Sequence, residues 1–170
     1  MQPKHGLALL VVPLLLGAAP ATKPLKKEGL FGQVLLEGKK FVPEKYPIGI
    51  ETHVCGTGKT RDALLVSKSG GVANAVVSLK TPPANSPPQE PLTVVMDQKT
   101  CEFIPHLVVV PKGGTIKFTN SDATLHNIRT TTRTEPFNKV AAANYSIEKK
   151  FTTSGVHPVR CDFHGWMKGF

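Results

Sequence analysis

Cys161, His164 and Met167 follow one another at intervals of three residues near the end of the sequence, as Cys-x2-His-x2-Met. The run Val156 to Arg160 before them has the pattern of a strand, so a short loop leaving its end can turn the three side chains toward one point. His126 follows a second strand-like run after a polar turn. We therefore take His126 as the candidate for a fourth donor that fixes this loop to the body of the fold.

The types of donor select the metal. One thiolate, two imidazoles and a thioether suit copper, whose trigonal sites of two histidines and one cysteine carry a weak axial Met. Zinc would take another Cys, His or carboxylate in place of Met167. Iron–sulfur clusters would take several thiolates. A site filled by four protein donors has no place for a substrate, so we expect it to move electrons rather than to break bonds.

The three cysteines can form at most one disulfide among themselves. Only Cys161 has other metal-ligand side chains within a few residues. We therefore predict a bond between Cys55 and Cys101, which leaves Cys161 as a thiolate. The alternative is that all three thiols are free.

The first residues have the pattern of a secretory signal peptide. Lys4 precedes an apolar run from Leu7 to Leu16, and small residues follow as far as Ala21. The run is about half of the roughly 20 residues that a spanning helix needs. We predict that residues 1–21 are a signal peptide cleaved near Ala21 and that the protein is periplasmic or secreted; the alternative is a retained membrane anchor.

The composition sets broad limits on the function. A chain of 170 residues with 40% hydrophobic side chains can bury one good core, and 15 glycines and 15 prolines exclude coiled coils and long helical bundles. The net charge of +9 is spread along the sequence without a dense basic run or an RNA-binding aromatic motif, which argues against nucleic acid. It favours encounters with redox proteins that have acidic surfaces, without stable membrane insertion.

Short apolar runs bounded by Gly, Pro and Asn predict an all-β chain. The predicted strands are Phe31 to Leu36, Ala63 to Ser67, Val72 to Leu79, Leu92 to Met96, Leu107 to Val110, Thr115 to Thr119, Tyr145 to Phe151 and Val156 to Arg160. Such spacing is typical of an antiparallel β-sandwich. The best candidate for a helix is Asn138 to Asn144. The proline-rich stretch Thr81 to Pro91 is predicted as a loop within one domain, with a linker between two domains as the alternative.

The part of the sequence that carries the candidate metal ligands resembles the cupredoxins, the blue-copper proteins that include plastocyanin and amicyanin. The resemblance covers roughly Phe103 to Met167, including the run from Pro105 to Asn120 and the pair His126 and Asn127. It implies a Greek-key β-sandwich that binds one type 1 copper ion. By this resemblance the copper ligands are His126, Cys161, His164 and Met167. Asn127 would tie the two ligand loops together by hydrogen bonds.

The resemblance also implies a domain organisation. Residues 22–170 would form one extended cupredoxin-like domain, with extra strands and the proline-rich loop at about 28–100 and the copper-binding core at about 101–170. The family closes its sheet with a strand after the Met ligand, whereas only Lys168 to Phe170 follow Met167. We therefore expect either that the natural chain is longer or that an N-terminal strand such as Phe31 to Leu36 fills that place.

The resulting expectation is an exported one-electron carrier between redox partners, not an enzyme. The first alternative is a periplasmic copper storage or delivery protein. A copper enzyme would need a second cluster of histidines, and His53, His106 and His157 do not form one in the sequence. A surface- or carbohydrate-binding sandwich is a further alternative. Trp166, between the ligands, either packs over the copper loop or belongs to an electron-transfer patch.

Overall fold

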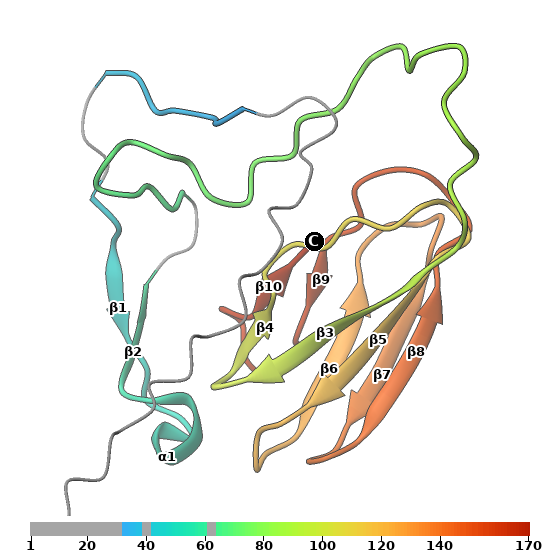
Figure 1. Ribbon diagram of the computed structural model, residues 1–170. Helices are drawn as coiled ribbons and strands as arrows, with labels where there is room; N and C mark the ends of the chain where they lie inside the picture. The colour runs from blue at the N-terminus through green and yellow to red at the C-terminus, as the bar shows by residue number, and fades with distance from the viewer. Residues whose placement is uncertain (1–31, 39–41, 61–63) are drawn as a thin grey trace, which may run out of the picture. The chain divides into compact units, whose positions relative to one another are not determined.

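The computed structural model describes residues 32–38, 42–60 and 64–170, and Gln33–Phe170 form one compact unit (Figure 1). The predicted signal peptide, residues 1–21, lies outside the described residues. The elements in chain order are β1 (Lys45–Pro47), α1 (Thr52–Cys55), β2 (Gly58–Thr60), β3 (Thr93–Lys99), β4 (Glu102–Ile104), β5 (Thr115–Asn120), β6 (His126–Thr130), β7 (Phe137–Ala141), β8 (Ser146–Lys150), β9 (Val159–Arg160) and β10 (Lys168–Gly169). Among these residues no helix is long and apolar enough to cross a membrane.

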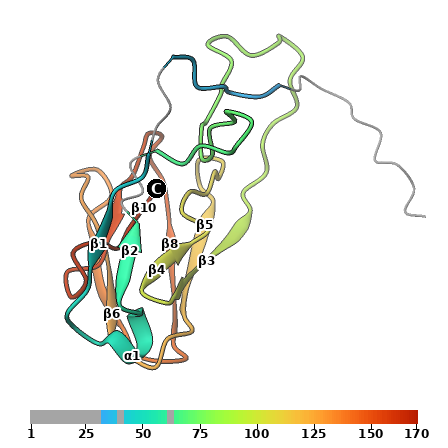
Figure 2. The same ribbon diagram turned by 90° about the vertical axis from the view of Figure 1, so that its left-hand side faces the viewer.

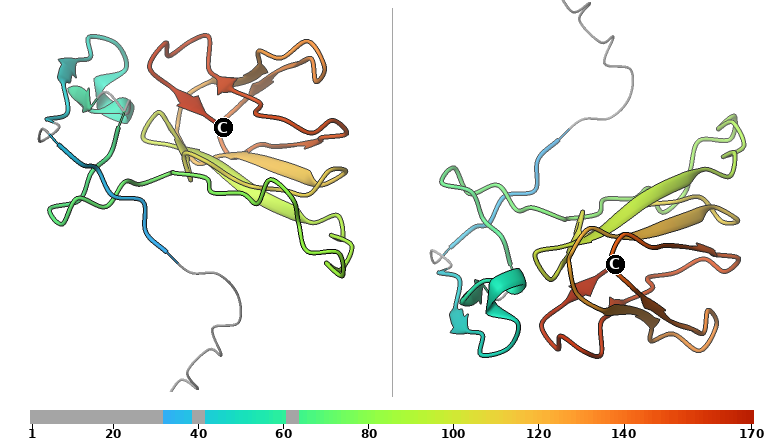
Figure 3. Two further views of the ribbon diagram at one scale, coloured as in Figure 1. Left: turned by 90° about the horizontal axis from the view of Figure 1, so that it is seen from above. Right: turned by 90° about the horizontal axis from the view of Figure 1, so that it is seen from below.

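Two four-stranded sheets form a sandwich, with strand orders β4-β3-β5-β8 and β10-β9-β6-β7. Seen from above and below, the strands lie in two layers (Figure 3). The all-β sandwich predicted from the sequence is thus confirmed. One pair of neighbours, β3 and β5, is parallel, because β4 turns back beside β3 and the chain then returns in the original direction on the other side.

The core lies between the two sheets. Met96 on β3, Phe118 on β5 and Ile128 on β6 have no exposed surface. Buried positions alternate along β5, as expected for a strand with one face toward the core. Phe118 stacks on Phe137 of the opposite sheet, with 6.4 Å between the ring centres. Burial of these apolar side chains is the main force that holds the sandwich together.

Four of the predicted strands lie outside the two sheets. The prediction of a strand over Val72 to Leu79 is wrong: Asn74 has a left-handed φ of 57°, and prolines follow at 82 and 83, so the run cannot stay extended and paired. The two predicted strands before it begin at the masked residues Phe31 and Ala63. Their described parts make single bridges, from Leu35 to Gly71 and from Val66 to Val72. The expectation that Phe31 to Leu36 completes the sandwich is therefore wrong for its described part.

The fourth predicted strand outside the two sheets is Leu107 to Val110. It does not form a strand, because prolines flank it at 105 and 111 and cannot donate to a sheet. Only the last two residues of the predicted strand Val156 to Arg160 are extended and paired, after Pro158. The helix predicted over Asn138 to Asn144 is wrong as well. Phe137–Ala141 form β7, which pairs along its whole length with β6. Pairing with β6 overrides the helical preference up to Ala141, and a turn follows at Ala143 and Asn144.

The short strand β10 pairs with β9 and places the end of the chain against the core. Lys168 lies opposite Arg160. Beyond it, Phe170 donates to the His106 carbonyl and accepts from the Val108 amide. A side chain at Gly169 would be crowded, since an added Cβ would lie 3.1 Å from the Cβ of Phe103 and 3.2 Å from the His106 oxygen.

The segment from β1 to β2 forms a small separate layer. Its two strands pair with each other, and α1 lies between them in the chain (Figure 2). A disulfide between Cys55 at the end of α1 and Cys101 beside β4 joins it to the sandwich. The sandwich itself begins at Thr93, so β3 belongs with the part of the chain that carries the predicted copper ligands.

Candidate metal centre

Strand pairing brings three of the predicted ligands, His126, Cys161 and His164, together. β6 begins at His126, and β9 ends one residue before Cys161. The two strands are antiparallel neighbours, with Arg129 opposite Arg160, so the start of β6 lies beside the chain that follows β9. That chain turns back tightly: Met167 donates to the His164 carbonyl, and Cys161 donates to the Met167 carbonyl. The turn directs Cys161 and His164 toward His126.

Three donor atoms face one another in the resulting cluster. The Nδ1 atoms of His126 and His164 are 3.0 Å apart, and the Sγ atom of Cys161 lies 3.9 Å from the first and 3.6 Å from the second. A first-row metal ion bonded to nitrogen at about 2.0 Å and to sulfur at about 2.3 Å holds such donors about 3.3 to 3.8 Å apart. The sulfur–nitrogen distance to His164 falls within this range, that to His126 is 0.1 Å longer, and the nitrogen–nitrogen distance is slightly shorter. These three residues therefore fit a metal ion.

The fourth predicted ligand, Met167, is buried in the same turn. Its exposed fraction is 1%, and its backbone is bonded to both Cys161 and His164. The other three are equally enclosed: His126 is 0%, Cys161 3% and His164 1% exposed. A cluster this dry and soft in its donors suits copper better than a hard, oxygen-seeking cation.

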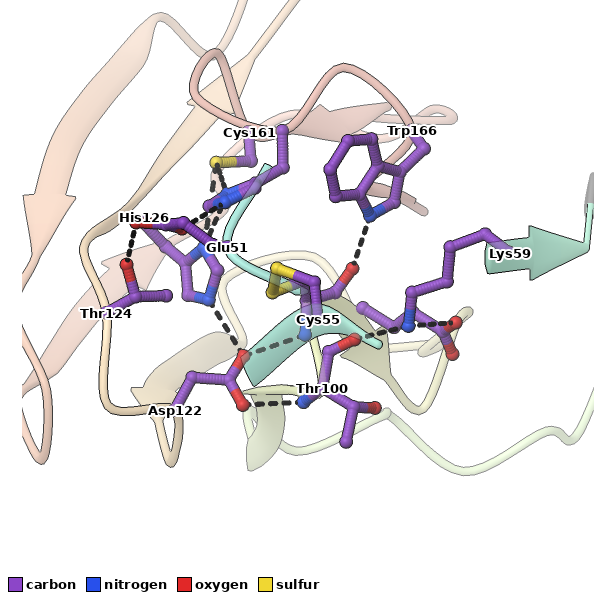
Figure 4. The surroundings of a disulfide bond; sticks show 12 residues. Glu51, Cys55, Lys59, Thr100, Asp122, Thr124, His126, Cys161 and Trp166 are labelled. Atoms are coloured by element: carbon purple, nitrogen blue, oxygen red, sulfur yellow. Dashed lines mark hydrogen bonds and ion pairs between the residues drawn. A yellow bond between two sulfur atoms is a disulfide. The ribbon is translucent and has the colours of Figure 1, made fainter. Parts of the chain in front are cut away.

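Each imidazole is held by a carboxylate at its other nitrogen. The Nε2 atom of His126 lies 2.8 Å from an Asp122 oxygen, and the Nε2 atom of His164 lies 2.7 Å from a Glu51 oxygen (Figure 4). Because each carboxylate accepts a hydrogen bond from Nε2–H, the Nδ1 lone pair is left free to point into the cluster. This arrangement fixes the tautomer and makes the nitrogen a better metal ligand.

Burial shifts the pKa of two of these groups. Burial lowers the pKa of His126, although the Asp122 hydrogen bond acts against it. Burial raises the pKa of the Cys161 thiol, while backbone hydrogen bonds from Asn127, His164 and Phe163 partly offset the effect. Those amides would stabilise a thiolate once a metal ion displaces the proton. Hydrogen bonds from Thr124 and then His164 lower the pKa of the Glu51 carboxyl.

Asn127 links the two ligand segments. Its Oδ1 accepts from the Asp162 amide at 2.6 Å, and its Nδ2 donates to the Asp162 carboxylate at 2.8 Å. The same Nδ2 donates to Asn138 on the neighbouring strand. Asn127 therefore ties the residue after His126 to the residue after Cys161.

The Cys55–Cys101 disulfide lies directly beside the cluster. Its sulfur atoms come within 4.8 Å of a His164 ring nitrogen. The pairing is the one that the sequence predicts, and Cys161 remains a free buried thiol. Trp166 donates its indole N–H to the Cys101 carbonyl at 3.0 Å, and its ring centre lies 5.2 Å from that of His164. These contacts favour the packing role over an exposed electron-transfer patch.

The other three histidines of the described residues are not grouped with the cluster. His106 packs edge-on against Phe170, with ring centres 5.6 Å apart. His157 is hydrogen-bonded to Thr132 and to the Thr153 carbonyl. His53 lies in the last turn of α1. Within the described part of the chain, none of the three belongs to a group of candidate metal ligands.

Sequence reasoning missed the two carboxylates. Asp122 could have been found, because it precedes His126 by four residues in a polar turn. Glu51 gives no sequence signal, since it stands 113 residues from His164 and reaches it only through the tertiary fold.

Comparison with known proteins gives the following. No family model matches the chain, and no curated protein is significantly similar to it. Among solved structures, a copper-containing nitrite reductase from Thermus scotoductus SA-01 aligns with TM-score 0.43 and 24% identity over 51% of this chain and 23% of its own. Amicyanin from Paracoccus versutus aligns with TM-score 0.43 and 18% identity over 51% and 79%. A purple cupredoxin from Nitrosopumilus maritimus aligns with TM-score 0.39 and 24% identity over 45% and 93%. Likenesses at this level do not assign the chain to a family.

Proposed function

We propose that this chain is an exported copper protein that carries one electron at a time between redox partners. One copper ion would be bound by His126, Cys161, His164 and Met167. The observation that carries the proposal is the buried cluster in which two Nδ1 atoms and one thiol sulfur face one another within 3.9 Å. When bound, copper supplies a couple between two oxidation states one electron apart.

The surrounding residues suit electron transfer because they hold the ligands nearly rigid. Asp122 and Glu51 fix the two imidazoles, and Asn127 fixes the loop that carries Cys161. The buried turn excludes water from the donor atoms, since every proposed ligand is at most 3% exposed. A rigid and dry ligand set keeps one geometry in both oxidation states, so little reorganisation accompanies the gain or loss of an electron.

The proposal includes no catalytic step for this chain. A copper enzyme would need further donors for a second metal ion, and His106 and His157 are engaged in contacts elsewhere. The net charge of +9 supports partners with acidic surfaces. We further propose that residues 1–21 are removed on export to the periplasm or the medium, which N-terminal sequencing of the mature protein would test.

A redox titration of the copper-loaded protein tests the carrier function against the storage or delivery alternative. We expect one copper ion per chain and a reversible one-electron couple that survives repeated cycles. Tight Cu(I) binding without a reversible couple, together with copper loss on oxidation, would favour storage or delivery and overturn the proposal.

A further inference from the structure

Glu51 contacts the metal centre from outside the sandwich. One of its carboxylate oxygens accepts from Thr124 Oγ1 at 2.7 Å, and the other lies 2.7 Å from His164 Nε2. The Glu51 side chain is 40% exposed, whereas that of His164 is 2% exposed. The carboxylate therefore covers the imidazole edge of His164 and separates it from solvent.

The local backbone is built to present this side chain. Glu51 has a left-handed φ of 46°, a conformation that non-glycine residues rarely adopt. Its carbonyl accepts from the amides of Val54 and Cys55, which starts the turn of α1. A strained backbone at a residue whose side chain reaches a ligand is typical of a position constrained by function.

One disulfide anchors the carboxylates of both histidines. Cys55 ends the helical turn that begins after Glu51. Its partner Cys101 donates its amide to Asp122 at 2.8 Å, and Asp122 holds His126. The Cys55–Cys101 bond thus links the Glu51 contact and the Asp122 contact through a single covalent connection.

We infer that Glu51 positions His164 for metal binding and slows metal exchange, and that the Cys55–Cys101 disulfide holds Glu51 in place. The inference rests on the proposed copper site. For the ion to leave, His164 must swing away from the cluster. That motion breaks the hydrogen bond to Glu51 or displaces the segment from β1 to β2.

The test measures the rate at which the copper-loaded protein loses its copper to excess EDTA. It compares this rate in the wild type, Glu51→Gln and Glu51→Ala. The matched control is Glu90→Ala, in the exposed proline-rich loop. Loss of a carboxylate that orients a ligating histidine commonly costs 10- to 100-fold in metal affinity, so we expect release about 10-fold faster in Glu51→Ala. Glu51→Gln keeps a hydrogen-bond acceptor and should stay close to the wild-type rate, and the control should equal it.

The reduction potential gives a second reading, since both Glu51 variants remove a negative charge beside the centre. We expect the potential to rise in Glu51→Gln as well as in Glu51→Ala, because the charge stabilises Cu(II). A merely structural role for Glu51 would leave the reduction potential of Glu51→Gln at the wild-type value.

The disulfide is tested with the double variant Cys55→Ser and Cys101→Ser, whose fold is checked by circular dichroism. We expect faster copper release, as in Glu51→Ala. Release at the wild-type rate from Glu51→Ala or, if that variant does not fold, from the double variant would overturn the inference while leaving the copper site intact. A wild-type protein that binds no copper, or a Cys161→Ser variant that binds it equally well, would instead overturn the proposed function.

Discussion

The sandwich from β3 to β10 and the described residues between 32 and 91 are held by different interactions. In the sandwich, apolar side chains alternate into a closed core, and Met96 and Phe118 have no exposed surface. In the earlier region, Val77 is 76% and Leu79 60% exposed, and the paired strands are three residues long. Hydrophobic burial thus dominates in the sandwich, while the earlier region buries few apolar side chains, chiefly Ile48, and adds the disulfide and polar contacts such as that of Glu51.

The two regions contribute different parts of the candidate metal centre. The buried sandwich supplies the rigid positions of His126 and Cys161, which are set by strand pairing. The earlier region supplies Glu51, which lies four residues before the disulfide-bonded Cys55. We therefore expect substitutions in the described residues before Thr93 to disturb the position of Glu51 more than the positions of His126 and Cys161.

The largest effect is expected from the core. Phe118→Ala should lower the free energy of unfolding by about 3 to 5 kcal/mol, because it leaves a cavity between the sheets. The matched change Leu79→Ala should alter it by no more than about 0.5 kcal/mol, since this side chain is mostly exposed. Urea unfolding measures both. Equal losses in the two variants would show that the two regions are not built differently.

Removing the disulfide should loosen the segment from β1 to β2 and leave the sandwich folded. The bond closes a loop with a sequence separation of 46. In the chain-entropy account such a link contributes about 4 kcal/mol. Hydrogen exchange in the double serine variant should become faster at Ile48 and Gly56, whose amides bond within the segment, while β5 and β6 stay protected. Uniform loss of protection would contradict a separately held segment.

A smaller effect is expected from acid. Burial alone would raise the pKa of Glu135, but hydrogen bonds from Lys149 and from the amides of Thr153 and Thr152 outweigh it and lower the pKa to about 2. The folded pKa lies below the unfolded value of 4.5, so this stability is complete above about pH 5 and is lost as the pH falls toward 2.

Glu135→Gln should therefore cost about 1 to 2 kcal/mol at neutral pH, allowing for solvent near the carboxylate. It should also flatten the decline in stability between about pH 5 and pH 2. Denaturant titrations at a series of pH values measure this. A variant with the wild-type slope would show that Glu135 does not link β8 to its neighbouring loop.

The sequence predicted what local pattern and short spacing determine. Alternation revealed β3, β5 and β8, and the intervals between Cys161, His164 and Met167 revealed the candidate site. It failed where long-range pairing decides. The alanines at 141 to 143 suggested a helix until the pairing of β7 with β6 is considered, and Glu51 reaches His164 across 113 residues only through the tertiary fold.

The most direct test of the central claim is the visible spectrum of the copper-loaded protein before and after Cys161→Ser. A thiolate bound to Cu(II) gives intense visible absorption, so the wild type should show a strong band at one copper ion per chain. The serine variant should lose this band, because a hydroxyl is a poor copper ligand. An equally strong band in Cys161→Ser would contradict a copper centre built on His126, Cys161 and His164.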